Sequence, residues 1–362
     1  MFNLYGWRLK YIKLEFFLNQ FILRKIMNIK TSIIGVSGYT GLELVKLLLT
    51  HRHFTLSSLY ASESHQDIAS LHPSLKSVIN LPIKEANKEK IAQECELAFL
   101  ALPHQKAMEY AKTLLEKNIK VVDLSADYRL SLEKYEQYYC SHSDKENLKS
   151  AVYGLVEYNR AEISKTNLVA NPGCYPTATL LALLPFAEYL DNTQSVYIDA
   201  KSGVSGAGKK LVQTSHFATI NENLFAYSPI SHRHSPEINE QLKKISKIQL
   251  KTLFVPHLIP LTRGMLVSIY ARLKEKIDPL KVLHERYKDE PFIRVRESCA
   301  QIKNVAGTHF CDIYAKVDEK DLFITSSIDN LLRGASSQAL ANANLMFGFD
   351  ESLGLPKIAY AP

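Results

Sequence analysis

The sequence predicts an α/β fold in two parts, the first built around a parallel sheet and the second, an α+β part, around a mainly antiparallel sheet. Three observations support this fold class. Strand-like and helix-like segments alternate from Ile29 to about residue 171, strand-like segments dominate after residue 190, and a glycine-rich turn follows the first strand. At roughly 150 residues per domain, a chain of 362 residues has room for two domains.

In the first part, short β-branched or apolar runs are interpreted as buried strands, and runs with a period near 3.6 residues as helices. We expect strands at 31–36, 54–61, 95–102 and 120–125, with helices at 41–51 and 107–118. Strands that alternate with helices form βαβ units, and the strands of such units lie parallel in one sheet.

In the second part, strands are expected at 195–203, 251–260, 264–273 and 291–297, and a hairpin over 310–328 that turns at Glu319 and Lys320. Extended segments with few helices between them favour antiparallel pairing. A helix over 331–349 then returns to the first part. We therefore expect residues 27–171 plus 331–362 to form one domain and residues 172–330 the other.

Residues 1–26 carry five basic side chains and one acidic side chain, which leaves only +3 of the formal net charge of +7 for the rest. Such a small surplus does not predict nucleic-acid binding. Polar residues interrupt the segment, which argues against a signal peptide and a membrane span, while an amphipathic surface helix is an alternative. Because a strand follows Met27 at once, we interpret residues 1–26 as an N-terminal extension upstream of the natural start.

The five cysteines include no CxxC pair, and their odd number argues against a disulfide framework. We therefore expect reduced thiols, a cytoplasmic protein and no metal site. Four of the cysteines are expected to be buried apolar fillers, namely Cys95, Cys140, Cys299 and Cys311.

Three glycines follow the first strand at a GxxGxxG spacing and precede a helix. Glycines at this place let the backbone turn sharply and approach a pyrophosphate, whose charge is favoured at a helix N-terminus. The segment predicts a Rossmann-type dinucleotide domain, with an ordinary βα turn as the alternative. The cofactor contacts expected here are Gly35, Ser37, Gly38, Tyr39, Thr40 and Gly41.

The end of the second strand bears on the choice of nicotinamide cofactor. A carboxylate there binds the ribose 2′-hydroxyl of NAD and repels the 2′-phosphate of NADP. Ser62 and Ser64 could donate to a 2′-phosphate, whereas Glu63 argues for NAD. The residues alone leave the choice open, with a lean towards NADP and a contact from Ser62.

Cys174 lies in the segment Asn171 to Pro176, just before an apolar run that ends at Pro185. Pro176 suits the first turn of a helix, so the thiol is expected at a helix N-terminus. The helix dipole and free N–H groups there favour a thiolate and lower its pKa, and the same groups could hold an oxyanion. A thiolate beside a dinucleotide predicts hydride transfer through a thiohemiacetal or thioester.

Several blocks from Met27 onward resemble, in order, those of the N-acetyl-gamma-glutamyl-phosphate reductases, a family related to aspartate-semialdehyde dehydrogenase. The blocks are GVSGYTGLEL (35–44), LALPH (100–104), DLSADYRL (123–130), VYGLVE (152–157), NPGCYPTA (171–178), KSGVSGAGKK (201–210), HRHSPEI (232–238) and HLIPLTRG (257–264). The resemblance implies NADPH-dependent reduction of a small acyl phosphate to an aldehyde with release of phosphate, in arginine biosynthesis. It also implies a homo-oligomer, a dimer or tetramer, formed through the second domain.

In the mechanism that the resemblance implies, Cys174 displaces phosphate to give a thioester, and a base handles the protons. A base with a pKa near neutral favours histidine. His232 and His234 are both candidates, with His234 preferred and Glu237 as an orienting or substrate-binding carboxylate. Both histidines are expected in a non-repetitive stretch.

The acyl phosphate and the substrate carboxylate call for cationic, forked donors. Arg129 resembles the phosphate clamp of the wider semialdehyde-dehydrogenase group, with an ion pair between domains as the alternative. Arg233 and Arg263 are candidates for the substrate carboxylate, although the latter could equally belong to a surface turn.

A second glycine-rich loop is expected to approach the nicotinamide through Ser202, Gly203 and Gly206, unless it is a plain hairpin loop. Asn330 resembles a family cofactor contact. Ser336 and Ser337 stand where the family pattern has a pair more like Ala-Gly, which weakens that assignment.

Two other readings of the function stay open on the sequence. The chain could be another acyl-phosphate or semialdehyde reductase, of the aspartate-semialdehyde type or of a carrier-protein-linked lysine pathway. It could also be a dinucleotide-binding sensor without catalysis, although a sensor has no need of a thiol at a helix terminus.

Overall fold

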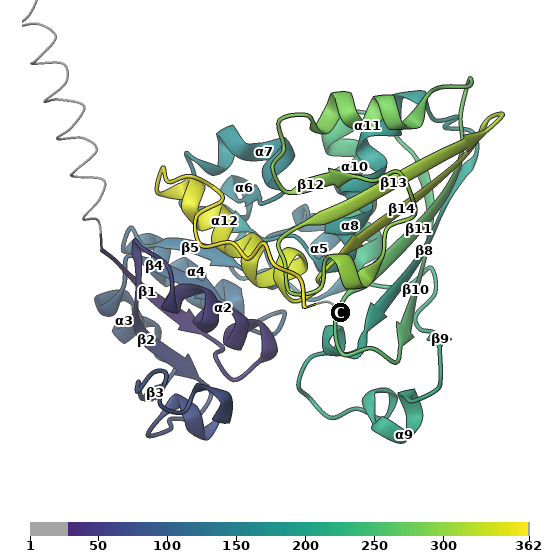
Figure 1. Cartoon of the computed structure of the whole chain (residues 1–362). Helices are drawn as coiled ribbons and strands as arrows, with labels where there is room; N and C mark the ends of the chain where they lie inside the picture. Colours follow the sequence, from purple (N-terminus) through teal and green to yellow (C-terminus); the bar gives the residue numbers. More distant parts are fainter. Residues whose placement is uncertain (1–27, 361–362) are drawn as a thin grey trace, which may run out of the picture.

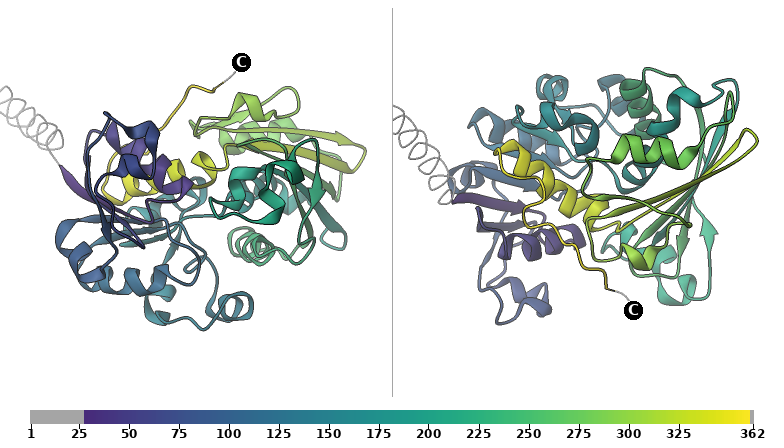
Figure 2. Two further views of the ribbon diagram at one scale, coloured as in Figure 1. Left: turned by 90° about the horizontal axis from the view of Figure 1, so that it is seen from below. Right: turned by 45° about the horizontal axis from the view of Figure 1, so that its top comes forward.

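A computed structural model describes residues 28–360, which fold around two seven-stranded sheets (Figure 1). The first sheet and its helices occupy one side of the molecule and the second sheet the other, with the C-terminal helix between them (Figures 1 and 2). The predicted fold class is confirmed, because the first sheet is parallel and the second is mixed and mostly antiparallel.

The first sheet has the strand order β3-β2-β1-β4-β5-β7-β6, and all of its strand pairs are parallel. Its strands are β1 (Ile29–Ile34), β2 (Phe54–Ala61), β3 (Ile83–Glu85), β4 (Leu97–Leu100), β5 (Lys120–Asp123), β6 (Val152–Tyr153) and β7 (Leu168–Ala170). Its helices are α2 (Tyr39–Leu49), α3 (Lys88–Glu94), α4 (Ala107–Glu116), α5 (Leu132–Tyr138), α6 (Lys145–Ser150) and α7 (Val156–Ile163). The strand order reverses between β1 and β4, and such a switch point is where α/β sheets bind ligands.

The second sheet has the order β12-β13-β14-β11-β8-β10-β9, with parallel pairing only between β8 and β10 and between β12 and β13 of the described strands. Its strands are β8 (Ser195–Gly203), β9 (Phe225–Ala226), β10 (Lys251–Ile259), β11 (Met265–Arg272), β12 (Ile293–Val295), β13 (Cys311–Asp318) and β14 (Asp321–Ile328). The associated helices are α8 (Cys174–Leu183), α9 (Phe217–Ile220), α10 (His234–Ser246) and α11 (Pro279–Tyr287). Short 3₁₀ turns lie at Ile68–Ser70, Pro73–Leu75, Leu184–Tyr189, Val204–Ala207, Gln213–Ser215 and Ile302–Asn304.

Helices α8, α10 and α11 pack against one face of the second sheet and share its apolar core. Helix α8 is mostly apolar, and nine of its ten residues are buried. The chain then returns to the first sheet through a π turn (Leu332–Ser336) and α12 (Ser337–Met346), whose Leu340 and Ala343 join the core formed by Leu44 and Val122. The C-terminal segment therefore connects the two sheets.

Most predicted elements are found close to their expected bounds. The strands at 54–61 and 195–203 coincide with β2 and β8, and the hairpin at 310–328 is formed by β13 and β14. The strand expected at 291–297 shrinks to the three residues of β12. The expectation that HRHSPEI is non-repetitive is wrong, because α10 begins at His234; Pro236 in its first turn was a usable signal.

The cysteine prediction is partly wrong. Cys95 and Cys311 are buried, but Cys140 is half-buried and Cys299 is exposed.

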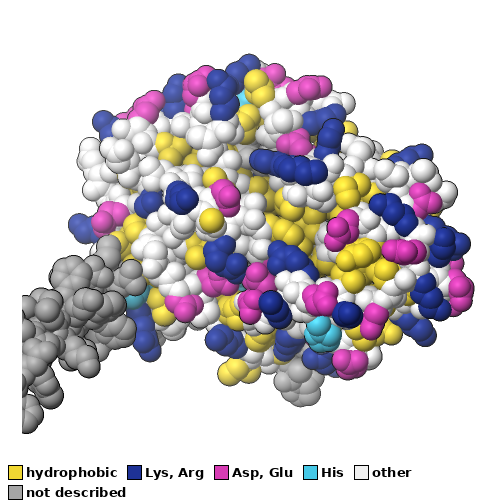
Figure 3. Space-filling view, turned by 90° about the horizontal axis from the view of Figure 1, so that it is seen from above, with side chains coloured by type: hydrophobic (Ala, Val, Ile, Leu, Met, Phe, Trp, Pro, Cys, Tyr) yellow, Lys and Arg dark blue, Asp and Glu magenta, His cyan; other side chains and the backbone are white. Residues whose placement is uncertain are grey.

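The proposed extension at 1–26 lies outside the described residues. Within residues 28–360, the longest apolar helix is too short to cross a membrane. On the face shown in Figure 3, basic side chains are interspersed with acidic ones.

Candidate active site

The glycine-rich loop lies at the carboxyl end of β1, at the switch point of the first sheet. Gly35 has φ of +95°, and a Cβ added to it would lie 2.2 Å from the carbonyl oxygen of Ala101. A Cβ on Gly41 would lie 2.6 Å from the oxygen of Gly35. Gly38 forms the N-cap of α2. The loop therefore needs glycine for its own geometry and offers a helix N-terminus to an anion, which fits the pyrophosphate of a dinucleotide.

The other predicted cofactor contacts near this loop are more exposed. Ser37 and Thr40 are half-buried, Tyr39 is exposed, and Ser62 is exposed just beyond the end of β2. Sequence reasoning missed His72, which is buried and whose Nε2 lies 2.8 Å from the carbonyl oxygen of Val36 inside the loop.

Cys174 is the first residue of α8, with Gly173 as the N-cap, as the prolines and glycine around it predicted. Its side chain is only half-buried. The expectation of a lowered pKa is wrong, because the apolar surroundings raise the pKa of the thiol to about 11. The backbone N–H of Tyr175 and the charge of Arg129 act in the opposite direction but do not outweigh burial. The uncharged thiol is therefore the stable form in the free protein.

Glu237 links the segment before the cysteine to its neighbours. The carboxylate is 1% exposed and accepts hydrogen bonds from the Gly173 N–H at 2.9 Å and the Tyr153 hydroxyl at 2.8 Å. It also pairs with the Arg129 guanidinium at 3.3 Å. Three bonds on one buried carboxylate fix the backbone immediately ahead of Cys174.

Arg129 is buried and bonds to both parts of the chain. It donates to the carbonyl oxygens of Asn171 and Leu124, each at 2.7 Å, and to Glu237. Coulombic attraction to Glu237 raises the pKa of the guanidinium although burial opposes it. The ion pair weighed as an alternative from the sequence is thus present, and it holds a permanent positive charge close to Cys174.

His234 and Arg129 lie against the same α-carbon. A Cβ added to Gly173 would lie 2.6 Å from His234 Nε2 and 2.9 Å from Arg129 Nη1. Burial lowers the pKa of His234 well below its usual value, and the neighbouring positive charges and histidines add to this effect. The imidazole is therefore neutral, and the expectation of a base with a pKa near neutral is wrong for the free protein. Its Nδ1 has no hydrogen-bond partner among the described residues.

His232 differs from His234 in how its ring is used. Its Nδ1 accepts the backbone N–H of His234 at 3.0 Å, which occupies that nitrogen in holding the start of α10. Burial lowers the pKa of His232 to about 4. The structure thus gives His232 a backbone contact and leaves the ring of His234 beside Gly173.

His104 is a further histidine near the site, and sequence reasoning missed it although it ends the LALPH block. It follows β4, and its Nδ1 accepts the N–H of Ala126 at 2.9 Å. Burial, with Arg129 and Arg233 nearby, lowers its pKa to about 3. Its position after the carboxyl end of a parallel strand was the available signal.

Arg233 and Arg263 are placed very differently. Arg233 is exposed and lies over the ring of Tyr139, 5.6 Å from its centroid. Arg263 bonds to Asp329 at 2.8 Å and to Glu43 at 3.3 Å, so two carboxylates already use its guanidinium.

The second glycine-rich loop follows β8 and is held by backbone contacts. A Cβ on Gly203 would lie 2.8 Å from the oxygen of Leu261, and one on Gly206 would lie 3.0 Å from Ser202 Oγ. Ser202 is buried, and Asn330 bonds to the Gly264 N–H at 2.7 Å and to Ser205 Oγ at 3.0 Å. Asn330 therefore stabilises this loop through two side-chain hydrogen bonds.

The π turn brings the cysteine and the first glycine loop together. A Cβ on Gly334 would lie 2.6 Å from the Cβ of Cys174, and Ser336 Oγ donates to the carbonyl oxygen of Thr40 at 3.0 Å. Two residues of one turn thus contact the segment of Cys174 and the segment that follows the first glycine loop.

Among residues 28–360, no cluster of three or more His, Cys, Asp or Glu side chains could hold a metal ion.

Comparisons with protein families agree with this arrangement. Residues 30–166 match the semialdehyde dehydrogenase NAD binding domain, and residues 174–330 match the semialdehyde dehydrogenase dimerisation domain. A curated relative from Wolinella succinogenes, an N-acetyl-gamma-glutamyl-phosphate reductase, is 61% identical over 92% of this chain and 99% of its own length. Those from Sulfurovum sp. and Sulfurimonas denitrificans carry the same name and are 58% and 52% identical, over 92% of this chain and 100% and 99% of their own lengths.

Solved structures of aspartate semialdehyde dehydrogenases share the fold. The enzyme II of Vibrio cholerae matches with a TM-score of 0.67 at 15% identity, over 88% of this chain and 98% of that one. The enzyme of Candida albicans with NADP matches with a TM-score of 0.64 at 15% identity, over the same shares of the two chains.

Proposed function

Because the chain belongs to the family of N-acetyl-gamma-glutamyl-phosphate reductases, we propose that Cys174 and His234 carry out the family's reaction here. The chain is an NADP-dependent oxidoreductase that reduces N-acetyl-gamma-glutamyl phosphate to N-acetylglutamate 5-semialdehyde, with release of phosphate, in arginine biosynthesis. The observation that carries the residue assignment is the position of His234 Nε2 against Gly173, the N-cap residue directly before Cys174.

In the first step, the sulfur of Cys174 attacks the acyl carbon and its proton passes to His234. The C–O bond to phosphate breaks, phosphate leaves with the bonding electrons, and a thioester on Cys174 remains. Neutral thiol and neutral imidazole are the stable forms of this pair, so the proton must move as the sulfur attacks. The N–H groups at the start of α8 would stabilise the oxyanion.

NADPH, when bound, supplies the hydride that reduces the thioester to a thiohemiacetal. The thiohemiacetal forms as its oxyanion. As the C–S bond breaks, this oxygen becomes the aldehyde carbonyl, and protonated His234 returns its proton to the departing sulfur, which restores the thiol of Cys174. We propose that the loop from Gly35 to Gly41 holds the pyrophosphate, that Ser62 lies at the adenosine end, and that Ser202, Gly203 and Gly206 border the nicotinamide. Gly35 and Gly41 support this because a side chain on either would collide with the backbone of the loop or of its neighbour.

For the substrate, we assign the charge of Arg129 to the acyl phosphate and that of Arg233 to the carboxylate. Arg129 has donor positions left after its three protein bonds, since a guanidinium carries five N–H groups. Arg233 is exposed and free of carboxylate partners within the described chain. Glu237 and Arg263 are assigned positioning roles rather than substrate contacts, because buried or paired partners occupy them. Asn330 is likewise assigned a positioning role, because it bonds to the second glycine-rich loop.

The test compares turnover of N-acetyl-gamma-glutamyl phosphate and aspartyl phosphate with NADPH and NADH, in the wild type and in Cys174→Ala. We expect turnover with the acetylated substrate and NADPH, and a loss of at least about 10⁴-fold in the variant. NADPH affinity should stay within a few fold in Cys174→Ala. Preference for aspartyl phosphate would contradict the substrate assignment, and unchanged turnover in Cys174→Ala would contradict the mechanism.

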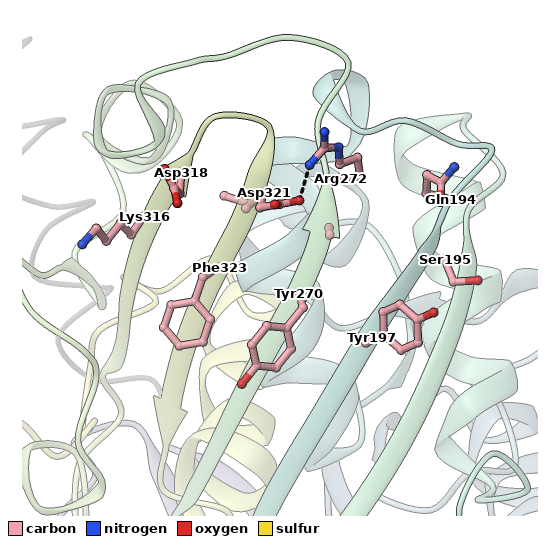
Figure 4. A pocket seen from close by; sticks show the side chains of 11 residues that line it. Gln194, Ser195, Tyr197, Tyr270, Arg272, Lys316, Asp318, Asp321 and Phe323 are labelled. Carbon is pink, nitrogen blue, oxygen red and sulfur yellow. Dashed lines mark hydrogen bonds and ion pairs between the residues drawn. The ribbon is translucent and has the colours of Figure 1, made fainter.

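We also propose a homodimer formed through the outer face of the second sheet. Tyr197, Tyr270 and Phe323 project to the same side from three neighbouring strands and line a hollow of about 580 Å³ (Figure 4). Tyr197 and Tyr270 are 55% and 48% exposed, and α8, α10 and α11 cover the opposite face. Sedimentation should show that Tyr270→Asp shifts the protein towards monomer, whereas Ile358→Asp, at another exposed apolar site, should not.

We further propose a cytoplasmic location, consistent with the five cysteines of the sequence and the free thiols of the described chain. We propose a division into a dinucleotide-binding domain (27–171 plus 331–362) and a second domain (172–330). It is supported by the separate cores of the two sheets, the first of which includes α12.

A further inference from the structure

The π turn at Leu332–Ser336 is a departure from regular helix directly before α12. The N–H of Gly334 bonds to the oxygen of Asp329 at 2.9 Å, and that of Ser336 bonds to the oxygen of Leu331 at 2.9 Å. Both bonds span five residues instead of four. Such turns are rare and occur frequently at functional sites.

Gly334 leaves no room for a side chain. A Cβ there would lie 2.6 Å from the Cβ of Cys174 and 3.1 Å from its Cα, and 3.4 Å from a methyl group of Ile328. The two nearest atoms belong to the backbone and first side-chain carbon of the nucleophile, which cannot swing aside as the tip of a long side chain can. A side chain at 334 must therefore displace either the π turn or the start of α8.

The same turn contacts the segments on both sides of the reaction. Ser336 Oγ donates to the oxygen of Thr40 in the first turn of α2, at 3.0 Å. Asn171 lies three residues before Cys174, and its Nδ2 donates to the carbonyl oxygen of Ala335 at 3.1 Å. The turn thus lies between the helix that follows the glycine loop and the loop that leads to the nucleophile.

The π turn is anchored by buried charge. Arg333 is 1% exposed, forms an ion pair with Glu157 of α7 and contacts the ring of His309. Asp329, fully buried, accepts the N–H groups of Leu331 and Leu332 at 2.9 and 3.0 Å. Buried ion pairs of this kind hold their partners in place because a charge left without its partner is strongly unfavourable.

We propose that this π turn sets the distance between Cys174 and the glycine loop, and that Gly334 is a positioning residue for the reductase reaction. The inference rests on the proposed role of Cys174. Gly334 touches the nucleophile through a packing contact alone, and its lack of a side chain lets the turn approach α8 closely enough to bond to Thr40 as well. Its replacement should impair the chemical step while substrate and cofactor still bind.

The decisive variant is Gly334→Ala, measured for kcat, KM, NADPH affinity and melting temperature. A nucleophile displaced by about 1 Å loses on the order of 10²-fold in rate, so kcat should fall about that much. KM and the Kd for NADPH should stay within about threefold, since Gly334 does not contact the residues that we propose to bind substrate or NADPH. The rate of Cys174 alkylation should change as well, because the thiol itself is displaced.

A destabilised control separates positioning from loss of folded protein. Ile91→Val removes one buried methyl group in α3, in a core cluster that does not include Cys174, and should lower the melting temperature without changing kcat. If Gly334→Ala keeps kcat within threefold, or loses NADPH affinity in parallel with kcat, the positioning role is overturned. An inactive wild type would instead overturn the proposed function.

If Gly334→Ala does not fold, Ser336→Ala decides the matter because it removes a hydroxyl without adding volume. Loss of its bond to Thr40 should lower kcat by roughly three- to tenfold at unchanged KM, as expected for one hydrogen bond. An unchanged kcat in this variant would then contradict the proposal.

Discussion

Helices α8 and α10 begin alike and then differ in almost every respect. Each starts with a reactive side chain, Cys174 or His234, and each has proline as its third residue. Helix α8 is buried on all sides and lies inside the core. Helix α10 buries only one side, and its last turn carries Lys243 and Lys244. A buried helix thus presents the proposed nucleophile, and a surface helix presents the proposed base.

The difference matters because the two N-termini share one carboxylate. A negative group near a helix N-terminus is stabilising, but the sequence of the first turn of α8, Cys-Tyr-Pro-Thr, contains none. Glu237 from the first turn of α10 bonds to Gly173 at the start of α8 and so serves both helices. The surface helix therefore supplies the charge that the buried helix lacks.

Burial also acts on the two reactive groups in opposite directions. It raises the pKa of Cys174 and lowers that of His234, and both shifts favour the uncharged form. The comparison indicates a neutral pair in the free enzyme, in which the proton moves only when the substrate is attacked.

The largest effect is expected for His234→Asn, which removes the proton acceptor beside Gly173. Loss of a general base lowers kcat by about 10² to 10⁴-fold, with NADPH affinity retained. The matched control is His232→Asn, whose amide oxygen can still accept the backbone N–H that His232 Nδ1 accepts now. Steady-state kinetics that show a larger loss for position 232 than for 234 would reverse the assignment.

How far the site could be predicted from sequence differs between the two helix starts. The α8 start was predicted because Gly173 and Pro176 are local signals for a turn followed by a helix. The α10 start was missed, although Pro236 gives a similar signal, since polar residues around it suggested an irregular segment. The local residue pattern therefore predicted the start of the helix that carries Cys174, but not the start of the helix that carries His234.

The electrostatics of the site could not be predicted from local pattern at all. A helix N-terminus lowers a thiol pKa, but the apolar core around Cys174 outweighs that effect, and the core forms only when distant strands pack. The contact between Gly334 and Cys174 joins residues 160 positions apart and gave no local signal. The fold class, which depends on repeated local periodicity, was by contrast confirmed.

The next effect concerns the shared carboxylate. Glu237→Gln keeps the size of the side chain but leaves the buried Arg129 charge without its partner, which should cost about 3 kcal/mol in the free energy of unfolding. The matched control, Glu240→Gln on the same helix, alters an exposed bond to Ser131 and should cost less than about 1 kcal/mol. Urea unfolding measures both, and equal costs would mean that Glu237 does not act as a buried partner.

The state of the thiol can be tested by the pH dependence of its alkylation. With a pKa of about 11, the thiolate fraction of Cys174 rises roughly tenfold per pH unit between pH 7 and 9, and the iodoacetamide rate should follow. The Cys174→Ser protein gives the background from the other four cysteines. A plateau already reached below pH 8 would show a thiolate in the free enzyme and would remove the neutral-pair interpretation.

The smallest effect lies at the other ends of the two helices and has the opposite sign. Helix α8 runs on into a 3₁₀ turn at Leu184, whereas α10 stops at Lys247, which is exposed and left-handed with φ of +63°. A residue with a Cβ is unfavourable there, so Lys247→Gly should stabilise the protein by about 1 kcal/mol. Lys247→Ala keeps the Cβ and should show no such gain in thermal unfolding, which separates backbone relief from the loss of the lysine charge. Equal stabilities for the two variants would mean that the left-handed backbone at the end of α10 costs no free energy of folding.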